Sequence, residues 1–215
     1  EIYDYEGEFF QLDQGGLRRG LGDREIPQVY FGGASPPGLD VASRYADVYL
    51  TWGEPLDAVA EKVRVIKEMA AGKGRSIRAG LRIHIITRDT EEEAWVEADR
   101  IIAGLDAAEV EKARERFSRM ESVGQAKMAE LAHGGDDDLV IAPNLWAGIG
   151  LVREGAGTAI VGSHEQVAER LLEYRDVGID EFILSGYPHL EEALRFGEYV
   201  RPLVDQATQP ALPGL

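Results

Sequence analysis

The stretch FILSGYPHLEE at residues 182–192 decides the fold, because a short apolar run there ends in polar residues just before a helix-like segment. An apolar run of this length is typical of a buried strand, and strands that lead into helices indicate an α/β architecture. Such proteins place their functional groups where the strands end. Tyr187 and His189, which follow the apolar run directly, are therefore candidate functional residues.

The same strand-then-helix pattern repeats upstream of this stretch. Strands are expected over residues 28–31, 48–52, 78–87, 158–161 and 179–185. Helices are expected over residues 39–46, 55–70, 90–105, 107–132, 163–177 and 190–200. In the helix at 55–70 the apolar residues recur at the period of an α-helix, which places them on one face. The alternation predicts a parallel sheet covered by helices.

Four such βα units are too few to close a (β/α)8 barrel, which takes about 250 residues. Two folds remain open, namely a small doubly wound domain and the C-terminal half of a barrel, in one domain over residues 1–215. A hairpin over residues 1–12 and a loop over 13–27 lead into the first strand, and there is no initial Met. These features favour the C-terminal half of a TIM barrel. Residues 134–157 interrupt the pattern with glycine and aspartate, and we expect a mobile lid there.

The composition excludes several classes of protein. With 39 acidic against 23 basic residues, the net charge is −16, which argues against binding of nucleic acid. The 215 residues include no cysteine, so disulfides, thiolate metal sites and cysteine nucleophiles are excluded. No apolar run approaches the roughly 20 residues of a membrane span, and no signal-peptide pattern is present. We therefore expect a cytoplasmic protein that binds neither nucleic acid nor membrane.

Two polar side chains lie on the strand expected at 78–87. Arg82 and His84 are two residues apart, so both side chains leave the same face of the strand. Inside a barrel, a guanidinium and an imidazole would need an anionic or polar partner, because burying them alone is costly. The alternative is an edge strand whose polar face meets water, but the flanking isoleucines indicate an internal strand.

Two glycine-containing loops are candidate anion or hinge segments. Gly33, Ala34 and Ser35 follow a strand and precede a helix, where backbone N–H groups and a hydroxyl can hold a phosphate. A tight turn that needs glycine is the alternative interpretation. The loop at 153–158 carries Arg153 and two glycines but lacks the lysine and the spacing of a P-loop. A flexible hinge that carries one arginine is the better interpretation of that loop.

The positions and spacing of the histidines do not indicate a metal site. His133 adjoins the Gly-Asp segment, and His164 lies in a capping box at the start of a helix, so both look peripheral. Neither has a metal-ligand spacing with His84 or His189, and no HExxH-type pair is present.

Six segments together carry a resemblance to a known family. They are YFGGAS at 30–35, YLTWGEP at 49–55, GLRIH at 80–84, PNLWAG at 143–148, LVR with GAGT at 151–158, and LSGYPHLEE at 184–192. In this order and at these spacings they resemble the alkanesulfonate monooxygenases, which are flavin enzymes of the bacterial-luciferase-like group. The resemblance runs from about residue 28 to 204 and corresponds to the C-terminal half of that family's (β/α)8 barrel. Ala34 stands where relatives tend to carry a second serine.

The resemblance implies an enzyme that receives reduced FMN from a partner NAD(P)H:FMN reductase. With O2, such an enzyme cleaves the carbon–sulfur bond of an alkanesulfonate and releases an aldehyde and sulfite. We also expect a homo-oligomer, because a half barrel alone would expose open sheet edges. Two alternatives stay open: a non-catalytic flavin-binding relative, and a luciferase-like enzyme that uses a deazaflavin or another substrate.

The resemblance also implies roles for individual residues. Arginine forks suit a small fixed anion such as a sulfonate, and a histidine suits proton transfer near neutral pH. The catalytic residues would be Arg82 and Arg153 as sulfonate clamps, His84 in proton transfer, and Tyr187 as a hydrogen-bond donor with His189 behind it. The cofactor residues would be Gly33, Ala34 and Ser35 at the FMN phosphate and Trp52 as a wall of the flavin pocket.

Overall fold

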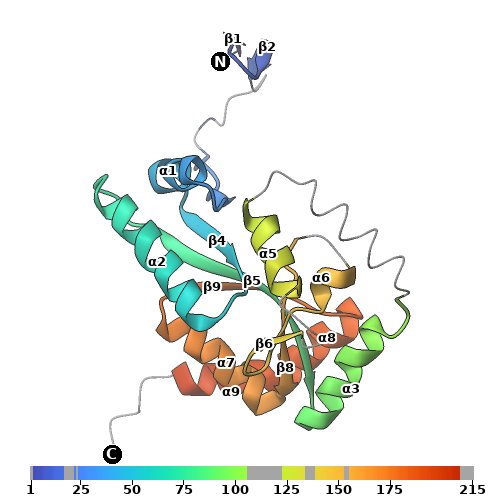
Figure 1. Ribbon diagram of the computed structural model, residues 1–215. Coiled ribbons are helices and arrows are strands. Elements are labelled where there is room, and N and C mark those ends of the chain that lie inside the picture. Colours follow the sequence, from blue (N-terminus) through green and yellow to red (C-terminus); the bar gives the residue numbers. More distant parts are fainter. Residues whose placement is uncertain are drawn as a thin grey trace, which may run out of the picture.

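The computed structural model describes residues 2–16, 22, 24–105, 123–133, 139–152 and 155–208. It confirms the expected fold class, an α/β fold with a curled half-barrel sheet (Figure 1). Five parallel strands each lead into a helix, in agreement with the five strand ranges expected, so the count of four βα units was one too low. The strands are β3 (Tyr30–Gly32), β4 (Val48–Trp52), β5 (Arg78–Arg88), β8 (Ala159–Ser163) and β9 (Glu181–Ser185). The helices are α1 (Pro36–Tyr45), α2 (Leu56–Ala71), α3 (Glu91–Ile102), α7 (His164–Asp176) and α8 (His189–Arg195).

An antiparallel hairpin of β1 (Ile2–Glu6) and β2 (Gln11–Gly16) precedes the sheet and stands apart from it in Figure 1. The hairpin was expected, but β2 continues to Gly16, so the prediction of a loop from residue 13 is wrong at its start. Between α3 and β8 the described residues form α5 (Val123–His133), β6 (Val140–Ala142), β7 (Leu145–Trp146) and α6 (Ile149–Val152). Helix α8 continues through the π-helix η1 (Phe196–Val200) into α9 (Arg201–Thr208), past the expected end at residue 200.

Residues 134–138, 153 and 154, which belong to the lid expected at 134–157, lie outside the described residues. The lid therefore stays a prediction. Of the described helices, none combines the length and the apolar character that a membrane crossing requires.

Strand β5 is the centre of the sheet. Its first part pairs with β4 through residues 78–82 and with β9 through 80–84, and its second part pairs with β8 through 84–88. Strand β8 begins close to the end of β4, as shown by the hydrogen bond that the Thr158 hydroxyl donates to the Gly53 carbonyl at 2.8 Å. Strand β5 is thus internal, and the alternative of an exposed edge strand is wrong. Arg82 and His84 lie where three strands meet.

The core is built on the buried side chains of β5. Leu81, Ile83 and Ile85 pack against residues of α2 and α7 in the larger of the hydrophobic clusters, and all three are at most 2% exposed. Burying an aliphatic side chain of this size contributes about 1.5–3 kcal/mol. Ile86 belongs to a second cluster with Ala94 and Ala98 of α3. The apolar faces of these helices therefore cover both sides of β5.

Side-chain caps fix where two of the helices begin. At α7, the Ser163 hydroxyl accepts from the Gln166 N–H and the Gln166 side chain accepts from the Ser163 N–H, which confirms the expected capping box. At α3, the Thr90 hydroxyl accepts from the Glu93 N–H at 3.2 Å. These caps place the turns that follow β8 and β5.

Gly53 is expected to tolerate no side chain. A Cβ at this position would lie 2.7 Å from the Thr158 hydroxyl and 2.8 Å from Ile83 Cγ1, at the junction of β4, β5 and β8. Gly53→Ala should therefore lower the free energy of unfolding by about 1–3 kcal/mol, the usual cost of overpacking. Urea unfolding followed by circular dichroism measures this change.

The matched control is Gly197→Ala in η1, where a Cβ would meet no atom within 4 Å. This substitution should raise the free energy of unfolding by about 0.4–1 kcal/mol, because alanine restricts the unfolded chain. Equal effects of the two substitutions would show that the junction at Gly53 is not tightly packed.

Candidate functional site

A pocket of about 250 Å³ opens beside the carboxyl end of β4, and we call it the Arg82 pocket. The residues that decide its chemistry are Gly33, Ala34, Trp52, Glu54, Lys62 and Arg82. Four of them, Gly33, Ala34, Trp52 and Arg82, were predicted as site residues. The fold thus brings the predicted cofactor loop and the predicted sulfonate clamp to one pocket.

Arg82 reaches this pocket from the middle of β5. Its Nε atom is buried and, among the described residues, has no hydrogen-bond partner. Buried polar groups are almost always hydrogen-bonded in native structures, and the donors of an arginine suit oxygen anions. Arg82 as a whole is partly exposed and lines the pocket, so it is the rest of the guanidinium that is placed to receive an anion.

A buried carboxylate beside Arg82 was not predicted. Glu54 is 2% exposed and forms ion pairs with two lysines, Lys62 of α2 and Lys127 of α5, the latter at 2.9 Å. Its backbone carbonyl accepts a hydrogen bond from the Tyr174 hydroxyl at 2.6 Å. Two lysines and Arg82 against one carboxylate leave an excess of positive charge around the pocket, which favours an anionic ligand.

The first turn of α1, which follows the predicted phosphate loop, offers few N–H groups to an anion. The Ser35 hydroxyl caps α1 by accepting from the Gly38 N–H at 3.2 Å, and Pro36 and Pro37 at the first two helical positions have no N–H. Gly33 and Ala34 of this loop line the Arg82 pocket, whereas the predicted phosphate ligand Ser35 is not among its lining residues. The helix N-terminus itself adds little.

Tyr49 holds this loop in place from β4. Its hydroxyl donates to the Gly33 carbonyl at 3.2 Å. Burial, with a smaller contribution from the Glu54 carboxylate, raises the pKa of Tyr49 to about 12. The hydroxyl therefore stays protonated and remains a donor across the physiological pH range.

Three further predicted residues form a row of rings. His84 and Tyr187 stack with ring centroids 5.6 Å apart and planes 16° apart, and the Tyr187 and His189 rings are 4.8 Å apart. His84 is 1% exposed, so the row begins in the core and ends at the surface with His189. The sequence interpretation that grouped these residues is consistent with this arrangement. The remaining predicted residue, Arg153, lies outside the described residues.

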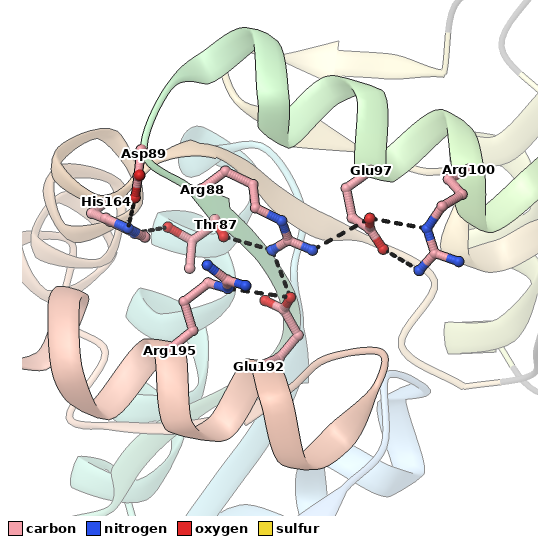
Figure 2. A network of polar contacts seen from close by, with 8 residues as sticks. All are labelled: Thr87, Arg88, Asp89, Glu97, Arg100, His164, Glu192 and Arg195. Carbon is pink, nitrogen blue, oxygen red and sulfur yellow. Dashed lines mark hydrogen bonds and ion pairs between the residues drawn. The ribbon is translucent and has the colours of Figure 1, made fainter.

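A polar network lies at the far end of β5 (Figure 2). Arg88 donates to the Glu192 carboxylate at 2.6 Å and lies 3.5 Å from the Glu97 carboxylate. His164, which looked peripheral from sequence, is only 8% exposed. Its Nδ1 lies 2.8 Å from the Thr87 hydroxyl and its Nε2 lies 3.2 Å from Asp89 Oδ1. The prediction that His164 is peripheral is wrong, because its helix begins directly against β5.

Metal ligation was not predicted for these groups. Within the described ranges, no three His, Cys, Asp or Glu side chains are arranged so that they could hold a metal ion.

Comparisons with known proteins agree with the fold. A family model described as luciferase-like monooxygenase matches residues 1–181. A solved structure of riboflavin lyase with modified FMN and riboflavin has a TM-score of 0.67 at 18% identity, over 96% of this chain and 49% of that one.

Two further solved structures have similar folds. EDTA monooxygenase from Chelativorans sp. BNC1 has a TM-score of 0.63 at 22% identity, over 97% of this chain and 53% of that one. An F420-dependent secondary alcohol dehydrogenase in complex with an F420-acetone adduct has a TM-score of 0.59 at 20% identity, over 94% of this chain and 56% of that one. The chain therefore spans about half the length of the solved structures that it matches.

Proposed function

The chain belongs to the luciferase-like monooxygenase family, and from that premise we propose that it acts in an FMN-dependent monooxygenase that cleaves the carbon–sulfur bond of alkanesulfonates. The reaction would consume reduced FMN and O2 and release an aldehyde and sulfite. Because the chain spans about half of its structural neighbours, the activity of the whole protein is part of this proposal.

One observation carries the choice of an anionic substrate. The Arg82 side chain lines the pocket together with Lys62, and Glu54 is the one carboxylate among the described lining residues. A sulfonate is a compact anion with three acceptor oxygens, and it suits the donors of a guanidinium. A neutral substrate would leave the excess positive charge of the pocket uncompensated.

The residues present fit the phosphate end of FMN. Gly33 and Ala34 of the loop before α1 line the Arg82 pocket, and so does Trp52. The pocket volume of about 250 Å³ is below the roughly 300–1,000 Å³ of typical small-molecule sites, so it would take the anionic ends of substrate and cofactor and not the whole molecules. When bound, reduced FMN would supply, with O2, the oxygen atom that the reaction adds to the substrate carbon.

The remaining steps would belong to side chains of this chain. Arg82 would bind and orient the sulfonate, and His84 would take up the proton from the carbon next to sulfur. Tyr187, stacked on His84 at 5.6 Å, would orient that imidazole and donate a hydrogen bond to the substrate, with His189 behind it. Arg153 would complete the sulfonate clamp. A partner NAD(P)H:FMN reductase, a homo-oligomeric assembly and a cytoplasmic location are proposed with the function.

The proposal is tested by sulfite release from the purified full-length protein. Linear alkanesulfonates of increasing chain length are supplied with O2 and with reduced FMN, generated by a separate reductase, and sulfite is measured with a thiol reagent. We expect sulfite to appear in proportion to the FMN oxidised, with a maximum at one chain length. Sulfite from none of the sulfonates would overturn the proposal. Oxidation of a secondary alcohol to the ketone with an oxidised deazaflavin, which accepts the hydride, would instead support the deazaflavin alternative.

A further inference from the structure

The Arg82 pocket has an apolar side as well as a charged one. Leu50, Trp52 and Gly124 line it together with Arg82. All four residues are partly exposed, so a ligand in the pocket can touch each of them. A compact anion would occupy only the Arg82 end, and the three other residues remain for the part of the ligand that carries the anion.

Trp52 lies next to Arg82 on the inner face of the sheet. The two residues are in register on β4 and β5, and residues in register on neighbouring parallel strands leave the same face. Tyr49 and Leu81 leave the opposite face, where they join hydrophobic clusters with the helices that cover the sheet. The indole therefore offers an apolar surface directly beside the guanidinium, where the carbons next to a bound sulfonate would lie.

Two glycines leave a hollow around Leu50 on the same inner face. Gly32 and Gly80 are in register with Leu50 on the strands to either side. A Cβ at Gly80 would lie 2.6 Å from Leu50 Cδ2, so the leucine side chain lies across that glycine. A Cβ at Gly32 would come no closer than 3.6 Å to any atom of Leu50, so that side stays open. The leucine thus forms an apolar floor that no neighbouring side chain covers from these two positions.

Helix α5 borders the pocket at Gly124. A Cβ at Gly124 would lie 3.4 Å from Cζ3 of Trp52, so the helix backbone passes close to the indole. The ion pair between Lys127 and Glu54 at 2.9 Å and the side chain of Met128, which is 3% exposed, hold the helix at this position. Glycine at this contact leaves a gap between helix and ring, and a larger side chain would close it.

We propose that the alkyl chain of the substrate leaves Arg82 along this apolar side and passes out of the pocket between Trp52 and Gly124. Leu50 forms the floor under its first carbons. Gly124 is then the residue that determines which chain lengths are accepted. The inference rests on the proposed binding of a sulfonate at Arg82 and narrows the substrate class to sulfonates with an unbranched apolar chain. Because the pocket holds only about 250 Å³, a long chain has to leave it through this gap.

The test is a calorimetric titration of the purified full-length protein with linear alkanesulfonates from ethanesulfonate to octanesulfonate. The protein is titrated anaerobically, with and without reduced FMN, so that affinity is measured without turnover. Each buried methylene strengthens binding about fourfold. We therefore expect the dissociation constant to fall by about this factor for each added carbon that contacts the pocket or the gap, and to level off once the chain reaches solvent.

Two substitutions at one position locate the chain. Gly124→Leu should weaken octanesulfonate binding at least about 15-fold, the contribution of two methylenes, and leave ethanesulfonate binding within about twofold. Gly124→Ala should have an intermediate effect, because its Cβ would be in ordinary contact with the indole. Ala126→Leu is the control, because Ala126 lies on the same helix, is exposed and does not line the pocket. It should leave both affinities unchanged.

Three results would overturn the inference. The first is a wild-type affinity that does not depend on chain length. The second is equal weakening of both sulfonates by Gly124→Leu, which would mean that the substitution displaces the helix instead of blocking the chain. The third is an unchanged chain-length profile in Gly124→Leu. The proposed function fails separately, if sulfonates bind with the expected dependence on chain length but release no sulfite when O2 is admitted.

Discussion

Replacing Arg82 with alanine is expected to lower kcat/KM for the best alkanesulfonate by about 10²–10³-fold, the usual cost of removing one preorganised donor to an anion. Arg82 is partly exposed and lines the pocket, so its guanidinium can bind the substrate without breaking an ion pair within the described residues. Arg82→Lys should recover only a small part of this loss, because an ammonium lacks the planar fork that binds two oxygens at once. Steady-state kinetics with reduced FMN supplied in excess measures both variants.

The control for Arg82 is Arg64→Ala. Arg64 lies on α2, is 53% exposed, and pairs only with Glu61 and Glu68 on the same helix among the described residues. Its removal should leave kcat/KM within about twofold, because exposed ion pairs contribute little. Flavin affinity, followed by fluorescence quenching, separates two roles of Arg82. If Arg82→Ala weakens flavin binding as much as it lowers kcat/KM, Arg82 binds the cofactor phosphate and the sulfonate assignment fails.

Much of the fold follows from local patterns in the sequence. The strand at Val48–Trp52 and the helix at Leu56–Ala71 agree with prediction to within a residue or so, because apolar periodicity directly reflects one buried face. The helix end near residue 200 is wrong for a physical reason. Helix α8 passes without a break through the π-helix η1 into α9, of which Pro202 is the second residue, and apolar periodicity does not reveal this connection. The pairing of β5 with three strands depends on long-range register, which periodicity does not encode.

Some residues of the candidate site could also be predicted from the sequence, and others could not. Arg82, His84, Tyr187 and His189 could be found because each is a polar residue in or just after an apolar strand. Glu54 could not, because a carboxylate after a strand usually lies in water. Its burial depends on Lys62 and on Lys127, which belongs to a separate helix. His164 was missed for a related reason, since a capping box signals a helix start and not whether that start is buried.

The largest stability effect is expected from Arg88, at the centre of the network in Figure 2. Arg88 is 15% exposed and donates to the carboxylate of Glu192, which is 2% exposed. Arg88→Met keeps the length of the side chain but leaves Glu192 with only the distant Arg195, at 3.9 Å, as a described cationic partner. Removing one member of a buried pair costs about 3–5 kcal/mol, because the remaining charge stays desolvated. For a chain of this size, the melting temperature should fall by roughly 6–20 °C.

Arg100→Met is the matched control, because Arg100 contacts the same Glu97 carboxylate as Arg88 but is 63% exposed. Its removal should change the free energy of unfolding by less than about 1 kcal/mol, since water replaces an exposed partner. Differential scanning calorimetry of the two variants compares a buried and an exposed arginine around one carboxylate. The double variant Arg88→Met, Glu192→Leu should be more stable than the single variant Arg88→Met, because it no longer has an unpaired carboxylate at position 192. If the double variant is less stable than Arg88→Met alone, the loss comes from packing of the arginine stem and not from the buried charge.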